Sequence, residues 1–457
     1  LTVMTFLGAG MLSGISAQVS PLQVDTLKET KIPDQWDLQS CIDYAKEQNI
    51  TIRKNRITAA STQIDVKTAK AALFPSLSFS TGHQVVNRPY QETSSRVSGS
   101  EIISSNSKTS YNGNYGLNAS WTLYNGNKRL KTIQQEKLNN QMAELDVATS
   151  ENNIQESIAQ VYIQILYAAE SVKVNENTLQ VSIAQRDRGQ ELLNAGSIAK
   201  SDLAQLEAQV STDRYQLVTA QATLEDYKLQ LKQLLELDGE NEMNIYLPAL
   251  SDENVLAPLP TKKDVYISAL SLRPEIEASK LNVEASELGI GIAKSSYLPT
   301  ISLSAGIGTN HTSGSDFTFG EQVKNGWNNS IGLSVSVPIF NNRQTKSAVQ
   351  KAKLQYETSM LSLLDEQKTL YKTIEGLWLD ANSAQQRYAA ANEKLKSTQI
   401  SYELISEQFN LGMKNTIELL TEKNNLLQAQ QEQLQAKYMA ILNTQLLKFY
   451  QGDQLAL

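Results

Sequence analysis

The sequence predicts a mainly α-helical protein with a small antiparallel β part, in which a strand hairpin followed by a long helix-turn-helix occurs twice. Three observations predict it: strands that alternate between apolar and polar residues, helical heptad patterns of great length, and a recurrence of the whole arrangement at an offset of 216 to 224 residues. A period above about 200 residues indicates a duplicated domain, because solenoid repeats are only about 20 to 50 residues long.

The clearest strand is residues 111–124, YNGNYGLNASWTLY. Its odd-numbered positions are apolar, aromatic or glycine, and its even-numbered positions are Asn, Gly, Ser, Thr and finally Tyr124. Successive side chains of a strand lie on opposite faces, so this order predicts a sheet with one apolar and one polar face. Soluble sheets and outer-membrane barrel strands both give this pattern. The strand by itself favours the soluble sheet.

The composition excludes several classes of protein. The chain has 457 residues with 41 Lys and Arg against 48 Asp and Glu, a net charge of −7 that argues against a nucleic-acid surface. Cys41 is the only cysteine, which rules out an intrachain disulfide and a zinc cluster. No Ser-His-Asp set, phosphate loop or metal motif is present, so we expect no enzyme activity, no cofactor and no metal. His83 and His311 are expected to be solvated.

The first residues resemble a secretory signal peptide. Residues 1–17 hold an apolar run followed by small residues, with cleavage expected after Ala17, although a buried first helix is the alternative. No cysteine follows the run, so we do not expect a lipid-anchored N-terminus. Beyond it, no stretch reaches the roughly 18 apolar residues of a membrane helix. If the protein spans a membrane, we expect it to do so as a β-barrel.

After a polar N-terminal segment, residues 18–35, the first structural repeat covers residues 36–237. Asp37 is a predicted N-cap, and a second helix ends before Pro75 because the residue before proline is displaced from helical geometry. Strands are predicted at about 76–86 and 111–124, joined by a long exposed loop or strand extension.

A helical hairpin follows at residues 128–237. Its first helix is on the order of 100 Å long, and Gly196 ends it as a left-handed C-cap. The second helix begins at Asp202 and carries a sustained heptad that Asp213 interrupts at one position. Such heptads pack helices side by side. Residues 238–263 contain three prolines and read as a linker.

The second repeat covers residues 264–450. Leu298-Pro299 is the counterpart of Phe74-Pro75 in the first repeat, and Gly412 is the counterpart of Gly196. Strands are predicted at about 300–309 and 329–340, with a polar loop between them, and a helical hairpin at 343–450. The second strand hairpin is eight residues shorter than the first, and residues 451–457 form a C-terminal tail.

Four strands cannot close a barrel, and an open sheet in lipid would leave unpaired edges. Several copies must therefore share one sheet, and three copies would supply about 12 strands around a water-filled lumen. The polar faces of the strands would line that lumen. We expect this lining to include Asn112, Asn114, Asn118, Ser120, Ser302, Ser304, Ser334 and Ser336.

These features together resemble the TolC family of outer-membrane efflux proteins. The resemblance rests on the duplication, the strand entries at Phe74-Pro75 and Leu298-Pro299, the strand exits at residues 123–125 and 339–341, and the two glycine tips. It covers about residues 36–450. It implies a homotrimer with a 12-stranded β-barrel in the outer membrane and an α-helical tunnel in the periplasm.

The resemblance also implies a function. Such a duct works with a periplasmic adaptor protein and an inner-membrane transporter, in a tripartite efflux or type I secretion system, and expels small toxic molecules or secreted proteins. The alternative is a trimeric coiled-coil protein with a structural or adhesive role at the surface. The alternating strands with a polar second face speak against it, because an adhesin needs no lumen. A soluble enzyme is disfavoured by the signal peptide and the absent catalytic motifs.

The resemblance further implies a periplasmic entrance at the helix-turn-helix tips. Asp202 and Glu418, each six residues past its glycine, fall where acidic rings constrict the tunnel, although both could serve only as first-turn acidic residues of a helix. Thr421 stands where many relatives have a second acidic residue. Lys414 falls where a basic residue often locks the closed state, and Phe409 either packs the closed entrance or caps a coiled-coil layer.

The two turns are also expected to dock the adaptor. The docking residues are Asn194, Ala195, Gly196 and Ser197 in the first turn and Asn410, Leu411, Gly412 and Met413 in the second. Aromatic residues near the strand ends suit an interfacial belt or core packing at the strand-helix junctions. They are Trp121, Tyr124, Tyr297, Trp327 and Phe340.

Overall fold

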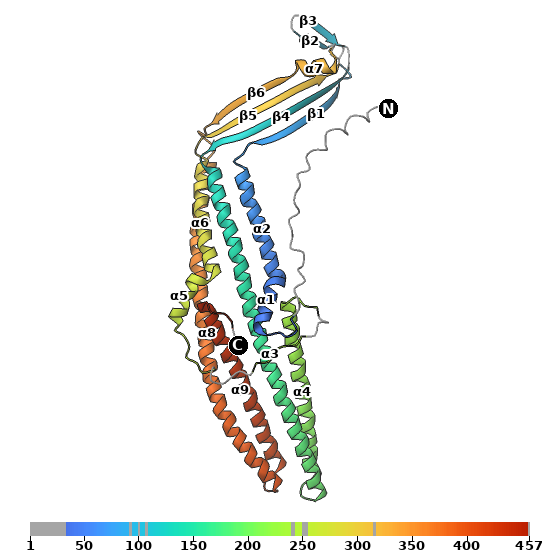
Figure 1. Cartoon of the computed structure of the whole chain (residues 1–457), viewed down its shortest axis with the longest axis vertical. Coiled ribbons are helices and arrows are strands. Elements are labelled where there is room, and N and C mark those ends of the chain that lie inside the picture. Colours follow the sequence, from blue (N-terminus) through green and yellow to red (C-terminus); the bar gives the residue numbers. More distant parts are fainter. Residues whose placement is uncertain are drawn as a thin grey trace.

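The molecule is elongated, with a sheet at one end and long helices that run from the sheet to two hairpin tips at the other (Figure 1). The computed structural model describes residues 33–90, 94–98, 101–105, 108–238, 243–248, 255–313 and 317–455. The expected signal peptide, and most of the polar segment after it, lie outside the described residues.

The two halves of the chain have the same order of elements. The first contains α1 (Leu38–Gln48), α2 (Ile50–Ala71), β1 (Ser76–Asn87), a small hairpin of β2 (Ser94–Ser98) and β3 (Glu101–Ser105), β4 (Thr109–Asn125), α3 (Lys128–Asn194) and α4 (Lys200–Leu234). The second contains α5 (Lys262–Leu272), α6 (Pro274–Ser295), β5 (Thr300–Thr312), α7 (Phe319–Asn325), β6 (Asn328–Ser336), α8 (Gln344–Asn410) and α9 (Thr416–Gln451).

Local sequence signals explain where the helices begin and end. The Asp37 carboxylate accepts a hydrogen bond from the Ser40 backbone N–H at 2.7 Å, so Asp37 caps α1 as predicted. Asn49 ends α1 and caps α2 through its side chain. The helices α3 and α8 each contain 67 residues, which corresponds to about 100 Å.

The four long strands form one antiparallel sheet in the order β1-β4-β5-β6. One row across it contains Leu77, Ala119, Ala305 and Ile331, and the next row contains Ser76, Ser120, Ser304 and Gly332. Since rows alternate between the two faces, the register produces one apolar and one polar face.

The structure corrects the strand predictions in three places. A β-bulge at Leu123 pairs Tyr124 with Ile301, which moves Tyr124 from the polar face to the apolar face. The last strand ends at Ser336 instead of residue 340, because Pro338, two residues later, has no N–H to continue the ladder. The predicted polar loop between β5 and β6 contains the short helix α7.

The main core lies where α1, α3 and α9 meet, midway along the helices, and contains Trp36, Cys41 and Tyr162. Burial raises the pKa of the Cys41 thiol to about 12. A second anchor holds the start of the second repeat. Arg273, between α5 and α6, forms an ion pair with Glu156 of α3 at 2.6 Å and lies 3.7 Å from the Tyr450 ring centroid of α9. Arg273 is buried, so its charge would be costly without the carboxylate of Glu156.

Candidate functional site

The two helical hairpins end in matching glycine turns. Gly196 and Gly412 both have φ of +74°, a left-handed conformation that favours glycine. The Ser197 N–H donates to the Leu192 carbonyl and the Met413 N–H donates to the Gln408 carbonyl, both at 2.8 Å. A Cβ at either glycine would meet no atom within 4 Å. The turns are therefore exposed backbone that a partner could approach closely.

Asp202 lies in the first turn of α4. Its Oδ2 atom accepts a hydrogen bond from the Ala199 backbone N–H at 3.0 Å. This contact satisfies one of the unpaired donors at the helix start, and the negative charge suits the positive end of the helix dipole. Asp202 therefore stabilises the start of its own helix within one chain, and its side chain remains partly exposed.

Glu418 occupies the equivalent place on α9 and has more partners. Its Oε1 atom accepts from Lys414 Nζ at 2.6 Å, and its Oε2 atom accepts from the Asn415 backbone N–H at 3.2 Å. The hydrogen bond from Lys414, followed by that from Asn415, lowers the pKa of Glu418 below its ordinary value of 4.5. The carboxylate therefore stays ionised in mildly acidic solution. Lys414 therefore pairs with a residue of its own hairpin end.

Phe409 and Thr421 differ in exposure. The Phe409 side chain is 3% exposed and packs inside the hairpin, which favours the coiled-coil reading of this residue. Thr421 is exposed on α9, and its hydroxyl donates to the Ile417 carbonyl at 2.8 Å.

An exposed stripe runs along α9 from the tip region towards the middle of the molecule. Its residues recur at alternating spacings of four and three, which places them on one side of the helix. They are Thr421, Asn425, Gln428, Glu432, Gln435 and Met439, of which Glu432 is partly buried.

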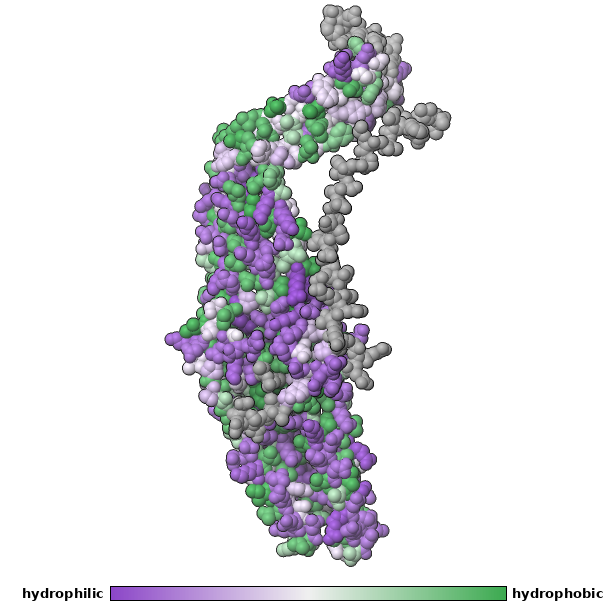
Figure 2. All heavy atoms as spheres, viewed as in Figure 1, coloured by the Kyte–Doolittle hydropathy of each residue, from purple (hydrophilic) through white to green (hydrophobic). Residues whose placement is uncertain are grey.

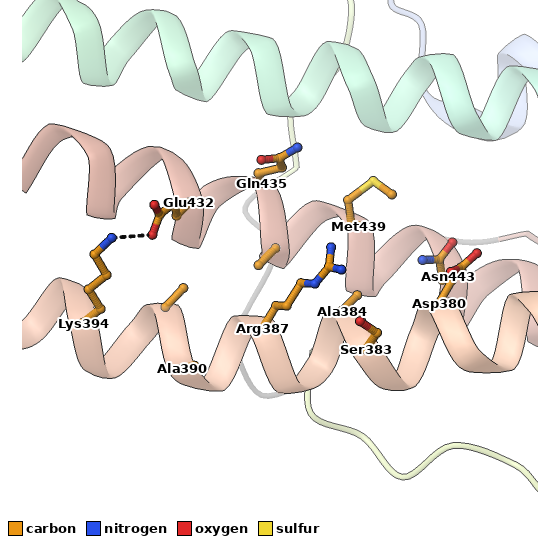
Figure 3. A pocket seen from close by; sticks show the side chains of 12 residues that line it. Asp380, Ser383, Ala384, Arg387, Ala390, Lys394, Glu432, Gln435, Met439 and Asn443 are labelled. Atoms are coloured by element: carbon orange, nitrogen blue, oxygen red, sulfur yellow. Dashed lines mark hydrogen bonds and ion pairs between the residues drawn. The ribbon is translucent and has the colours of Figure 1, made fainter.

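The stripe leads into a groove of about 540 Å³ between α8 and α9 (Figure 3). Arg387 of α8 points into this groove, and Lys394 of α8 forms an ion pair with Glu432 of α9 at 2.7 Å. Alanines such as Ala384 and Ala436 form part of its lining. The groove thus combines small apolar groups with charges of both signs.

The eight strand residues predicted to line a lumen all fall in polar rows of the sheet. Ser120 pairs with Ser304, Ser302 pairs with Ser334, and Ser336 pairs with Thr300. Asn112, Asn114 and Asn118 continue the same face along β4. Hydrophobic residues gather over the sheet, most densely where it meets the helices, whereas the helical part is largely hydrophilic (Figure 2).

His83 is exposed, as predicted, whereas His311 is partly buried, and both lie in an aromatic cluster that the sequence did not predict. His83 and His311 both pair in register with Gly113, and both rings lie beside Tyr111. The Tyr111 hydroxyl lies 2.6 Å from His83 Nδ1. A Cβ at Gly113 would come within 3.2 Å of that nitrogen, so the glycine makes room for the ring.

Sequence reasoning also missed a buried polar cluster of Ser182, Asp213 and Lys423. In the sequence, Asp213 is conspicuous because it interrupts the heptad of α4. Ser182 and Lys423 are not conspicuous, because polar residues are common on a long helix and the sequence does not show which side of it is buried.

The described residues contain no group of three or more side chains suited to a metal ion. Among the described helices, none combines the length and the apolarity needed to cross a bilayer.

Comparison with known proteins gives the family. The model of the outer membrane efflux protein family matches residues 41–236 and 265–452. The efflux protein BepC of Brucella suis is 24% identical over 64% of this chain. The matched region spans 61% of BepC, about three fifths of the length of that protein. TolC of Salmonella enteritidis is 21% identical, with 91% of this chain and 82% of TolC covered.

The crystal structure of CusC superimposes with a TM-score of 0.77 at 19% identity, over 91% of this chain and 92% of CusC. At that identity the likeness concerns the fold. The family match, which covers most of the chain in two blocks, goes further. The chain belongs to the outer membrane efflux protein family, and it is a TolC-like protein of the outer membrane.

Proposed function

We propose that the chain is one protomer of a homotrimeric export duct. Three four-stranded sheets join into a 12-stranded β-barrel in the outer membrane, and the helices continue it as a tunnel through the periplasm. The duct passes small toxic molecules or secreted proteins to the exterior.

The observation that carries this proposal is the apolar face of the sheet. Many of its side chains are exposed in the single chain, among them Leu77 at 70%, Leu333 at 65% and Ile331 at 83%. Soluble monomers rarely leave a contiguous apolar surface of this kind uncovered. A surrounding lipid bilayer would cover it, while the opposite polar face would line a water-filled channel.

The edges of the sheet support assembly of several chains. In the four-stranded sheet, β1 and β6 each have one neighbour, so each presents unpaired backbone groups along one side. Because neighbouring strands alternate in direction, β6 of one chain would run antiparallel to β1 of the next. Closure of three copies removes these edges, as a lipid environment requires.

The helices leave matching edges. On α4, Tyr215, Val218 and Leu229 are exposed at 73%, 59% and 58%. On α8, Ile400 and Leu404 are exposed at 52% and 54%. Large apolar residues at helical spacing on two free edges suit packing of α4 of one chain against α8 of the next.

In this assembly the glycine tips form the periplasmic entrance. Asp202 and Glu418 supply carboxylates at its rim, with Lys414 and Thr421 beside them. Three copies of each acid would favour cations and repel anions. The exposed stripe of α9 and the groove between α8 and α9 continue the duct wall above this rim.

The tips also receive the periplasmic adaptor, through the exposed backbone at residues 194–198 and 410–414, and the adaptor links the duct to an inner-membrane transporter. The class of cargo differs among relatives, one of which is named for toxin and drug export and another for alkaline protease secretion. The shared duct architecture serves both kinds of cargo.

The test combines mobility and conductance. A detergent-extracted membrane fraction is run with and without heating, and the purified protein is reconstituted for single-channel recording. A duct gives a heat-sensitive trimer band and discrete ion conductance. A trimer without conductance would instead indicate the adhesive coiled-coil protein, and a monomer in the soluble fraction would exclude both.

A further inference from the structure

A polar layer joins the two helical hairpins near their tips. Its centre is Lys423 of α9, which contacts both the Asp213 carboxylate of α4 and the Ser182 hydroxyl of α3. The Ser182 hydroxyl in turn donates to Asp213. These three side chains come from three different helices, and two of those helices belong to the other hairpin.

The three groups are almost completely buried. The exposure of Ser182 and Asp213 is 1% and that of Lys423 is 3%. Removing an ammonium and a carboxylate from water is costly, and an ion pair at such a place is weak evidence for stability in itself. Another role is therefore needed to account for charges where a coiled coil would place leucine.

Further hydrogen bonds extend the layer to all four helices. Gln209 of α4 donates to Asp213 at 2.9 Å and lies 3.3 Å from the Asn424 side-chain oxygen of α9. Gln185 of α3 donates to the Tyr402 hydroxyl of α8 at 2.9 Å. Every helix of the two hairpins thus contributes to one cross-section.

Apolar residues flank this cross-section on both sides along the helices. Leu206, Val210 and Leu419 lie on the side of the tips, and Leu179, Leu426 and Leu427 lie on the other side, all buried. Leucine layers of this kind are interchangeable, because a slip of one heptad replaces one apolar contact by another. The same slip would carry Lys423 or Asp213 into an apolar layer without its partner, which is strongly disfavoured.

We propose that Ser182, Asp213 and Lys423 are positioning residues that fix the axial register between the two hairpins. Ser182 precedes Gly196 by 14 residues and Lys423 follows Gly412 by 11, so the layer lies about 15 to 20 Å from both tips. Over that distance the helices are continuous, and their register sets how level the two tips stand. The entrance and the docking surface then present both turns at one height.

The experiment measures the distance between the tips directly. Spin labels are placed at Ser197→Cys and Met413→Cys, two exposed turn positions, in chains diluted with unlabelled chains. Cys41 is buried and its pKa is raised to about 12, so it does not compete for the label. Pulsed dipolar spectroscopy gives the distance distribution in the full-length protein.

The decisive variant is Asp213→Leu with Lys423→Met, which replaces the pair by apolar residues. We expect a folded protein whose tip distances broaden or shift, since a slip of one heptad moves one hairpin along the other by ~10 Å. The matched control is Arg56→Met with Glu151→Leu, which removes an exposed ion pair between α2 and α3 and should leave the distribution unchanged. A wild-type distribution in the folded apolar variant overturns the proposal.

A swapped pair, Asp213→Lys with Lys423→Asp, provides a second test should the apolar variant fail to fold. It keeps opposite charges at the same level, so a narrow wild-type distribution supports the proposal and a broad one overturns it. The inference rests on the proposed duct only where it calls the tips an entrance. If the tip distances change and the conductance does not, the proposal that the tips form the entrance is rejected, whereas the proposal that this layer sets the register still holds.

Discussion

Two ion pairs that each have one partner on α9 lie close together along that helix and differ in their surroundings. Lys414 and Glu418 pair at the tip with side chains 33% and 40% exposed, whereas Lys423 and Asp213 pair between the hairpins at 3% and 1%. An exposed pair contributes little to folding because water solvates each partner alone. A buried pair leaves a costly unpaired charge when one partner is lost. The same chemistry thus suits a surface function at the tip and a structural constraint within the hairpins.

The largest expected effect separates the two pairs by stability. Asp213→Asn should lower the free energy of unfolding by about 3–5 kcal/mol, since it leaves the Lys423 ammonium buried without its counter-ion. Urea unfolding of the purified protein measures the loss. Burial lowers the pKa of Lys423, because the neutral amine is less costly to bury than the ammonium.

The sign of the pH dependence follows from this shift. The pKa of Lys423 is lower in the folded state than in the unfolded state, so the unfolded state binds more protons. The folded Asp213→Asn variant should therefore become more stable as the pH rises towards 10.5. Asp213→Leu with Lys423→Met should recover most of the loss. Equal instability of the single and double variants would contradict the assignment of the loss to an unpaired charge.

An intermediate effect concerns conduction at the tip. Replacing Asp202 and Glu418 together by alanine removes the carboxylates from the proposed rim. We expect a higher passive leak and a fall in cation preference on the order of tenfold or less, with little change in urea resistance. Reversal potentials in a salt gradient and block by divalent cations measure it. Unchanged conductance and block in the double variant would remove these residues from the entrance.

The smallest expected effect is the acid response of Glu418. Lys414 lowers its pKa below 4.5, so its charge is present above that pH and is lost as pH falls through the lowered value. In an Asp202→Ala background, cation preference should therefore persist at pH 4.5 and decline only below it. Lys414→Met should move the decline to higher pH. A decline at the same pH with and without Lys414 would show that another group titrates.

Much of the fold follows from local sequence. The alternation in β4, the heptads of α3 and α8, and the glycines at both tips predict elements whose bounds the structure places within a few residues. These signals are local because strand and helix periodicities differ and because a left-handed turn favours glycine. The errors at Tyr124 and Pro338 arose where a bulge or a missing N–H interrupts a regular pattern.

The candidate site divides in the same way. Sequence position alone put Asp202 and Glu418 in the first turns of their helices, since the count from a glycine turn is local. It could not find the contact of Glu418 with Lys414, because the conformations of two side chains decide it. It also could not bring His83 and His311 to Tyr111, since the pairing register of β1, β4 and β5 decides which of their side chains meet.

The sequence by itself determined the duplicated architecture, the two-faced sheet and the glycine-capped tips, because periodicity and turn chemistry act between near neighbours. Only the tertiary structure decided which polar residues of the heptads are buried and whom they meet. Ser182, Asp213 and Lys423 stand on three helices, and their meeting depends on the rotation and axial register of each. No pattern within one helix encodes that register, because it is a property of the packing between helices.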